Sequence, residues 1–328
     1  MKDPTQSYRF KTFAKGFFRL IGLILFITKY QILYRKIYQT EVLPLLKNLP
    51  DDLAGRRLRK RTKNYGITIS GFFGPATLQM AGYHPSLADH KLLCLTGSAM
   101  PGFDACYDES IVNTRRIQSI LLEGQQPNDS PYEQLAHILW IKLKELTPDT
   151  TRLNDLTQKI IEIQTRSLIQ TTSTNRSVIE TATREKGIAG ALFFTLPISK
   201  ENQVNLLPCI EKLGAWVQLS DDLHDLRSDL LEHNNTLIST ASSLKDIEEI
   251  YNVWATEALK SLPSKTPQTV RSGFLLYHFQ NIVFIKHLKD CLNGKTPQEA
   301  IDISRDEYYN YKSKLVSWGL FKALTLQP

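Results

Sequence analysis

Apolar residues recur every three or four positions along nearly the whole chain, and this spacing restricts its fold more than any other feature. The period is that of amphipathic helices, and it covers residues 17–47, 52–64, 66–82, 86–108, 110–123, 131–146, 151–173, 176–196, 203–232, 244–261, 267–293 and 297–323. Strand-like alternation is scarce, and glycine, proline and asparagine fall between the periodic segments. Ser130–Pro131 and Thr296–Pro297 mark two helix starts, because proline suits the first helical position after a serine or threonine cap. We therefore expect an all-α protein with about ten to twelve helices.

The composition fits one large globular domain. The chain has 328 residues, 42% of them hydrophobic, which is enough to bury a sizeable core. We predict a single helical domain over residues 39–328, preceded by a basic and apolar helix over residues 1–38. The four cysteines form no CxxC pair, which favours buried thiols in the reducing cytoplasm and no structural zinc.

The net charge of +7 suits an anionic ligand or a membrane surface. The sequence contains neither zinc-finger spacing nor an aromatic and basic RNA-binding motif, so we expect no nucleic-acid partner. It also contains no GxGxxG or Walker-type phosphate loop.

The N-terminal segment combines a short apolar run with flanking cations. Only nine uncharged residues separate Arg19 from Lys29, whereas a membrane-spanning helix needs about 20. The cations around this run are Lys11, Lys15, Arg19, Lys29, Arg35 and Lys36. This pattern is typical of a helix in a membrane interface, and we expect peripheral contact with an anionic membrane. An ordinary first helix packed on the domain is the alternative, and the two interpretations are compatible.

Four aspartates follow directly on an apolar segment in LGAWVQLSDDLHDLRSDLLE, residues 213–232. Asp221, Asp225 and Asp229 are spaced i, i+4, i+8, so we expect them along one face of a helix. Like charges at this spacing destabilise a helix by a few tenths of a kcal/mol per pair. The interleaved leucines direct the same helix into a core, where carboxylates need a partner. A divalent metal fits that need better than a solvated acidic face does.

A second acidic cluster lies in GFDACYDESIVNTRRIQ, residues 102–118. Asp104 and Asp108 are again spaced i, i+4, and Glu109 follows them. Two helices that both carry carboxylates can face one another across a cavity, and such hard oxygen ligands suit Mg²⁺ completed by substrate phosphates. The cations beside the two clusters would hold a diphosphate; they are Arg115, Arg116, Arg176, Arg184 and Lys186.

These segments resemble motifs of the trans-isoprenyl diphosphate synthases. LGAWVQLSDDLHD, residues 213–225, is similar to the second aspartate-rich motif of that family, which ends in DDxxD. EKGIAGALFF, residues 185–194, resembles the lysine-containing segment that precedes that motif. FDACYDESIVNTRR, residues 103–116, stands where the family carries its first DDxxD and a paired arginine. The resemblance covers roughly residues 66–240.

The resemblance implies the class I isoprenoid synthase fold, a helical bundle around a central apolar pocket with Mg²⁺ and diphosphate at its mouth. It implies that the metal ligands are Asp104, Asp108, Asp221, Asp222 and Asp225, and that diphosphate is held by Arg115, Arg116 and Lys186. Glu109 and Asp229 extend the expected metal ligands, and Arg176 and Arg184 extend the expected diphosphate-binding cations. The implied cofactor is Mg²⁺, three ions bound together with diphosphate. The catalytic residues would be Asp104, Asp108, Asp221, Asp225 and Lys186.

Aromatic side chains are expected to line the apolar pocket, although each one taken singly fits an ordinary core position better. The candidates are Phe72, Phe73, Tyr107, Phe193, Phe194, Trp216, Tyr277 and Phe279. We also expect Tyr308 and Tyr309, from the last helix, to close over the diphosphate. His224 lies on a different helical face from the aspartates, and we expect it to pack or to support them.

Two departures from the family pattern bear on the reaction. The first motif is DxxxDE rather than DDxxD. Chain-elongating members bind their second substrate through a basic segment, and TISGFFGPA, residues 68–76, stands where that segment should end. We interpret the basic GRRLRKR, residues 55–61, as a solvated helix face rather than as a displaced equivalent. Loss of the second cationic site predicts a class I terpene synthase that ionises one prenyl diphosphate and then cyclises or rearranges the carbocation.

Three alternatives stay open at this point. A chain-elongating prenyl diphosphate synthase would require isopentenyl diphosphate as well. A non-catalytic homologue is disfavoured because all three aspartates of the second motif are kept. A lipid-binding helical protein at a membrane surface would show no Mg²⁺ dependence. We expect a prenyl diphosphate substrate and a cytoplasmic location that includes the membrane periphery. The sequence leaves open whether the protein is a homodimer, how long the prenyl chain is and which product forms.

Overall fold

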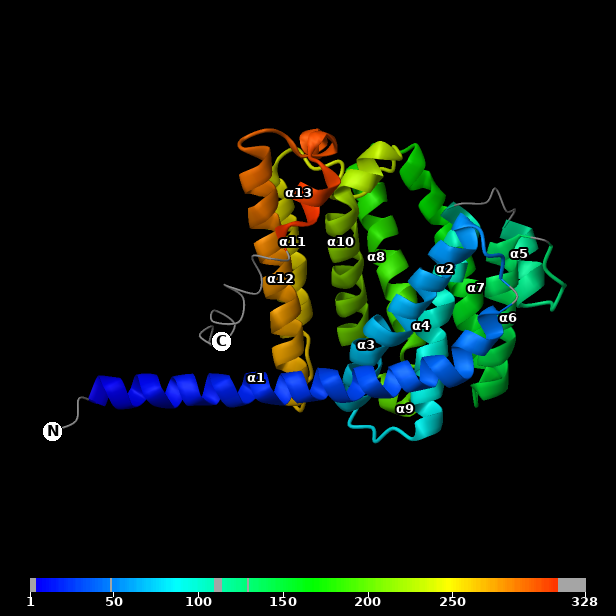
Figure 1. Ribbon diagram of the computed structural model, residues 1–328, viewed down its shortest axis with the longest axis horizontal. Helices are drawn as coiled ribbons and strands as arrows, with labels where there is room; N and C mark the ends of the chain where they lie inside the picture. The colour runs from blue at the N-terminus through cyan, green and yellow to red at the C-terminus, as the bar shows by residue number, and fades with distance from the viewer. Residues whose placement is uncertain (1–3, 48, 109–113, 129, 312–328) are drawn as a thin grey trace. The chain divides into compact units, whose positions relative to one another are not determined.

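The computed structural model describes residues 4–47, 49–108, 114–128 and 130–311, with side chains from Arg19 onward except that of Asp108. Every regular element in these ranges is helical, and no strand occurs there (Figure 1). The predicted all-α class is therefore confirmed. None of the described helices is both long enough and apolar enough to cross a membrane.

The chain divides into two compact units. Unit 1 comprises Met1–Phe26, Ile169–Arg184 and Ala215–Pro328, and unit 2 comprises Ile27–Leu168 and Glu185–Gly214. Three helices, α1 (Pro4–Ile37), α8 (Arg176–Phe193) and α10 (Leu207–Leu231), contribute residues to both units. The single domain over residues 39–328 stays a prediction.

Unit 2 is built around α4 (Leu87–Asp108). Its other complete α-helices are α2 (Leu53–Asn64), α3 (Ser70–Met80), α5 (Thr114–Leu121), α6 (Pro131–Leu146), α7 (Thr150–Ser167) and α9 (Lys200–Gln203). Short π-helical or 3-10 turns adjoin several of them, at Tyr38–Val42, Leu43–Leu46 and Tyr65–Ile69. A further 3-10 turn, Leu168–Thr171, follows α7 and continues from unit 2 into unit 1.

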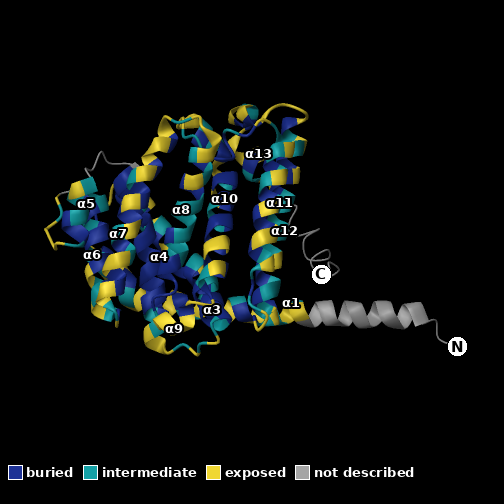
Figure 2. Ribbon diagram, turned by 180° about the vertical axis from the view of Figure 1, so that it is seen from behind, coloured by how far each residue is buried: buried dark blue, intermediate teal, exposed yellow. Residues whose placement is uncertain are grey.

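The helix α4 is buried along most of its length (Figure 2). It packs against α2, α3 and α6, and small residues allow the closest of these approaches. A Cβ atom on Gly97 would lie 1.9 Å from Ser70 Oγ, and one on Gly66 would lie 2.1 Å from Ser98 Oγ. Phe103 packs against Trp140 and Phe193, with ring centroids 5.9 and 6.5 Å away. Phe193 is thus a core residue of unit 2.

Unit 1 contains the first half of α8, most of α10, then α11 (Leu244–Lys260), α12 (Gln268–Leu292), a 3-10 turn (Pro297–Asp302) and α13 (Arg305–Tyr309). Trp216 on α10 is fully buried. Its ring lies 5.2 Å from that of Tyr277 and 6.5 Å from that of Phe274, centroid to centroid. Trp216 therefore serves the core of unit 1.

Most predicted helices match the observed ones closely, and the largest difference is at the C-terminal end. In place of a helix over 297–323, the 3-10 turn ends at Ile303 in extended conformation, and Ser304 caps the short α13 by accepting a hydrogen bond from the Glu307 amide. Residues 312–323 lie outside the described residues. Both predicted helix starts are confirmed: Ser130 caps α6, and Thr296 forms a capping box with Glu299.

The apolar residues of α1 form two stripes with different exposure. One stripe is buried and consists of Leu23, Phe26, Tyr30, Tyr34 and Ile37. The other is exposed and includes Ile21, Ile24, Leu25 and Ile32. The interpretation as a packed helix therefore holds for the buried stripe, whereas contact of the exposed stripe with a membrane stays a prediction. The side chains of Lys11 and Lys15 lie outside the described residues.

Replacement of Arg152 by methionine is predicted to destabilise unit 2. The buried guanidinium donates to the carbonyl oxygens of Thr195 and Ile198 at 2.7 Å each, directly after α8. Without it the Ile198 carbonyl oxygen loses its charged donor, and the Thr195 carbonyl oxygen keeps only the Ile198 amide and Gln203 Nε2. We therefore expect the free energy of unfolding to fall by about 3 kcal/mol in chemical denaturation. The matched control is Arg166→Met, which removes an exposed ion pair with Glu185 and should cost less than about 1 kcal/mol. Equal losses in the two variants would contradict this account.

Candidate functional site

The four aspartates of α10 form an exposed pair and a buried pair. Asp221 and Asp225 are exposed, whereas Asp222 and Asp229 are buried, with 7% and 8% of their surface exposed. The division follows from helix geometry, because the seven-residue step from Asp222 to Asp229 returns to within about 20° of the same face. The eight-residue step from Asp221 leaves Asp229 about 80° away. The expected single row of Asp221, Asp225 and Asp229 is thus corrected.

Neighbouring side chains hold Asp222 in place. Thr183 Oγ1, on α8, donates to one carboxylate oxygen at 3.2 Å. Gln218 Nε2, one turn earlier on α10, donates to the other at 3.0 Å. Thr183 Oγ1 in turn accepts a hydrogen bond from Gln170 Nε2 at 3.4 Å. The orientation of this carboxylate is therefore fixed on both sides.

The buried carboxyl group of Asp229 has a strongly raised pKa. Burial, together with the charges of Asp222 and Asp225, raises the pKa of Asp229 to about 8. Asn234 Nδ2 donates to Asp229 Oδ1 at 3.2 Å, which lowers the pKa without reversing the effect. A cation near these carboxylates would be strongly favoured.

Two tyrosines lie near the exposed pair, and an arginine lies near one of these tyrosines. Burial raises the pKa of Tyr309 on α13; the charge of Asp225 raises it as well, and Arg305 lowers it. Burial also raises the pKa of Tyr277 on α12, and Asp221 contributes in the same direction. Both phenols are therefore protonated donors at neutral pH, and α13 adds a guanidinium. Arg305 was not among the predicted site residues, although it lies within the predicted last helix.

Tyr308 and His224 have packing roles. Tyr308 is fully buried and donates to the Leu223 carbonyl oxygen at 3.3 Å. It cannot close over a diphosphate from this position, so that expectation is corrected for Tyr308 and stays a prediction for Tyr309. His224 stacks on Phe284, 4.4 Å between ring centroids, and its Nε2 is 3.0 Å from Asn281 Oδ1. This agrees with the expected packing role of His224.

The first acidic cluster is described only at Asp104. Within the fully described stretch 92–107, Asp104 is the one residue that is not buried. Gln164 Nε2 donates to its Oδ1 at 3.0 Å, and Arg61 Nη2 lies 3.9 Å from its Oδ2. Arg61 belongs to the basic stretch 55–61. At this position the stretch approaches a carboxylate, while its interpretation as a solvated helix face stays a prediction. The Asp108 side chain and Glu109 lie outside the described residues.

Two of the predicted diphosphate-binding cations lie in unit 2, one following the first acidic cluster and the other on α8. Arg115 on α5 is exposed, and Lys186 on α8 is half-buried. A third, Arg116, has a different role. Its guanidinium donates to the Gln126 carbonyl oxygen at 2.7 Å and pairs with buried Glu133 at 3.3 Å. It fastens the connection between α5 and α6, which corrects its expected role with diphosphate.

The other two predicted cations, Arg176 and Arg184, are held by partners in unit 1. Arg176 forms a bidentate ion pair with Asp246, with N–O distances of 2.8 and 3.1 Å. Arg184 pairs with Glu180 at 3.0 Å and lies over the Trp254 ring at 3.9 Å. Their nearness to the motifs in sequence therefore does not make them part of the site in this structure.

The two acidic clusters belong to different units, Asp104 to unit 2 and the aspartates of α10 to unit 1. Their joint use of metal ions, and the central apolar pocket, stay predictions. Among the described residues, no group of three or more histidine, cysteine and acidic side chains is arranged to hold a metal ion. No protein-family model, curated protein or solved structure matches this chain.

Replacement of Asp229 by asparagine is predicted to change how stability depends on pH. The folded state keeps a proton on Asp229 up to about pH 8, whereas the usual aspartate value is 3.8. Between pH 3.8 and about pH 8, the Asp229 carboxyl group makes the free energy of unfolding fall as pH rises, by up to about 1.4 kcal/mol per pH unit. Above the folded-state pKa this pH dependence ends. Asp229→Asn removes that slope. Its stability relative to wild type should therefore grow from pH 5 to pH 8 and then level off.

Chemical denaturation in the presence of EDTA measures this difference. Asp225→Asn is the matched control, because it neutralises an exposed carboxylate on the same helix and should give a much smaller pH-dependent gain. A constant difference between Asp229→Asn and wild type over this pH range would show that Asp229 has an ordinary pKa.

Proposed function

We propose that this chain is a Mg²⁺-dependent class I terpene synthase of the isoprenoid synthase fold, which ionises one prenyl diphosphate and cyclises or rearranges the carbocation. The observation that carries the proposal is the electrostatic arrangement on α10. Its exposed pair, Asp221 and Asp225, is backed by the buried Asp222 and Asp229. The resemblance of the same segment to the second aspartate-rich motif of the trans-isoprenyl diphosphate synthases supports the same function.

The donor set fits Mg²⁺. This ion is usually held by one or two carboxylates, with water and substrate phosphates completing its shell. Asp221 and Asp225 are exposed and one helical turn apart, with Cβ atoms roughly 5–6 Å from each other. The raised pKa of Asp229 reflects burial first and then the charges of Asp222 and Asp225, and a cation beside these carboxylates would offset that repulsion. When bound, Mg²⁺ would stabilise the charge that builds on the leaving diphosphate.

The remaining groups of the site bind and orient the diphosphate. Arg305, whose charge like that of Asp225 influences Tyr309, supplies a guanidinium that can make paired hydrogen bonds to phosphate oxygens. Tyr309 keeps its proton at neutral pH and is a further donor. Asp222 is anchored by Thr183 and Gln218, which holds this face of α10 in one conformation. Such fixed charges cost little reorganisation when the carbon–oxygen bond breaks.

One observation favours the alternative of chain elongation. Arg61, from the basic stretch 55–61, lies 3.9 Å from Asp104 in unit 2. A cation beside the first acidic cluster is what a second diphosphate substrate would need. The requirement for isopentenyl diphosphate separates the two reactions, because a terpene synthase consumes a single prenyl diphosphate.

The proposal is tested by incubating the full chain and Mg²⁺ with prenyl diphosphates of increasing length, with and without isopentenyl diphosphate. Mass spectrometry of the extract should show a hydrocarbon or alcohol formed from a single prenyl diphosphate. A longer prenyl diphosphate formed only with isopentenyl diphosphate would establish chain elongation instead. Absence of Mg²⁺-dependent turnover with every substrate would contradict both reactions and favour the non-catalytic or lipid-binding alternatives.

Asp221→Asn and Asp225→Asn are each predicted to reduce turnover about 100-fold or more, because they remove a charged ligand at the leaving group. Stability should be unchanged or slightly higher, since each change relieves like-charge repulsion on the helix. Diphosphate release measures the rate, and chemical denaturation measures the stability. Asp155→Asn on α7, an exposed aspartate elsewhere, is the control and should behave as wild type. Wild-type rates in both α10 variants would remove these residues from the site.

A further inference from the structure

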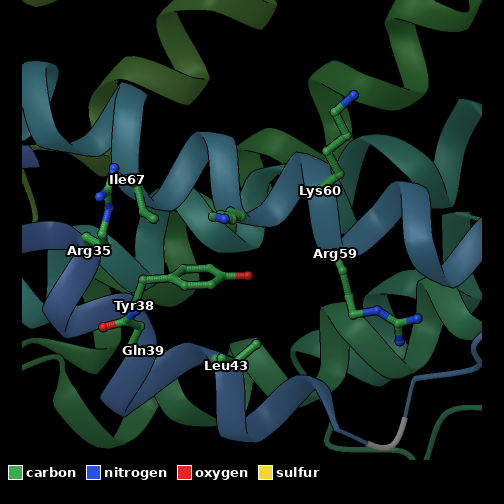
Figure 3. Close-up of a pocket in the computed structure, with 8 residues that line it drawn as sticks. Arg35, Tyr38, Gln39, Leu43, Arg59, Lys60 and Ile67 are labelled. Carbon is green, nitrogen blue, oxygen red and sulfur yellow. The ribbon is translucent and has the colours of Figure 1, made fainter.

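A basic cleft lies in unit 2 between the end of α1, the turns that follow it, and α2 (Figure 3). Its volume is about 690 Å³, and no acidic residue lines it. The residues that determine its chemistry are Arg35, Tyr38, Leu43, Arg59, Lys60 and Lys63. The size is that of a small-ligand site, and four of these six side chains are cations.

The positive charge in this cleft is largely uncompensated. Of its four cations, only Arg59 forms an ion pair with a described carboxylate, that of Asp51 at 2.7 Å. Arg59 also donates to the Leu49 carbonyl oxygen at 3.0 Å, so its position is fixed. Arg35, Lys60 and Lys63 are exposed. Like charges gathered around one hollow repel each other, and an anion bound between them would relieve that repulsion.

The cleft faces away from the first acidic cluster. Arg59 and Lys63 are one turn apart on α2, and Arg61, midway between them in sequence, lies roughly 160° round the helix from both. Arg61 is the residue that approaches Asp104. The two faces of α2 therefore carry different groups, and the cleft is separate from the surroundings of Asp104.

The floor of the cleft adds a neutral donor. Tyr38 is 3% exposed, and burial raises its pKa to about 12, so it keeps its proton at neutral pH. Figure 3 shows its hydroxyl directed toward the α2 backbone near Arg59, while the Arg59 and Lys60 side chains extend away from it. A protonated phenol close enough to Arg59 for that charge to lower its pKa suits an oxyanion, which accepts hydrogen bonds and balances charge.

We propose that this cleft binds a phosphate group. Arginine and lysine together provide the directed and the mobile donors that phosphate oxygens use. Two exposed apolar side chains adjoin the cations: Leu43 lines the cleft and is 45% exposed, and Ile32, one turn before Arg35 on α1, is 65% exposed. Apolar side chains beside cations are typical of surfaces that enter a lipid interface. The phosphate of an anionic lipid headgroup is therefore the source that the surface fits best, with free phosphate or diphosphate as the other source.

Two binding assays on the full chain distinguish these sources. Co-sedimentation with phosphatidylcholine vesicles, with and without phosphatidic acid, measures the lipid source. Calorimetric titration with inorganic phosphate and with diphosphate measures the soluble source. The test variant is Lys60→Glu/Lys63→Glu. The matched control is Lys159→Glu/Lys212→Glu, which makes the same charge change at two exposed positions of unit 2 outside the cleft.

Wild-type protein should bind the phosphatidic acid vesicles, and the Lys60→Glu/Lys63→Glu variant should bind them at least about tenfold more weakly. The control double variant should lose far less vesicle binding. Ile32→Ser should weaken vesicle binding without changing the affinity for inorganic phosphate. The cleft variant could instead lose binding of inorganic phosphate or diphosphate while its vesicle binding stays unchanged. That result would support a phosphate site in the cleft whose ligand is soluble rather than a lipid headgroup. The proposal is overturned if neither ligand binds, or if the two double variants lose binding equally. Chemical denaturation of both variants confirms that each is folded.

Discussion

Crowding of carboxylates on one helix is the constraint around which the candidate site is organised. Four aspartates occupy nine residues of α10, and burial with mutual repulsion raises the pKa of Asp229 to about 8. Packing keeps the helix in place despite this repulsion. Leu219, Leu223 and Leu226 are fully buried on the same helix and contribute about 1.5–3 kcal/mol each. Repulsion between exposed aspartates costs only a few tenths of a kcal/mol per pair, so the core can support a charged surface that a cation would stabilise further.

The helices and their ends were largely predictable because the signals are local. The 3.6-residue apolar period identifies each helix, and the caps at Ser130 and Thr296 are visible in the sequence. The break at Ile303 was missed, since the apolar period continues through it. The burial of Asp229 could have been foreseen from its distance of seven residues from Asp222. Seven residues come closer to two full helical turns than the eight residues that separate Asp229 from Asp221.

The partners of the cations could not be predicted from nearness in sequence. Arg116 follows the first acidic cluster but binds Glu133, and Arg176 binds Asp246, 70 residues away. Conversely, Arg61 and Arg305 lie far from the acidic motifs in sequence. The structure brings Arg61 to Asp104 and places Arg305 within electrostatic reach of Tyr309, which Asp225 also influences. Only tertiary packing decides which cation meets which carboxylate. The useful signals were the arginine within the basic stretch 55–61 and the arginine just before the tyrosine pair at 308–309.

The central claim is that the aspartates of α10 bind Mg²⁺ and diphosphate together. Calorimetric titration of Mg²⁺ into wild-type protein and into Asp221→Asn/Asp225→Asn, each with and without inorganic diphosphate, tests it most directly. Diphosphate should raise the apparent Mg²⁺ affinity of the wild type by about tenfold or more, because each ligand supplies charge that the other needs. The double variant should lose this coupling while it remains folded. Equal Mg²⁺ affinity with and without diphosphate in the wild type, or the same coupling in both proteins, would contradict the account.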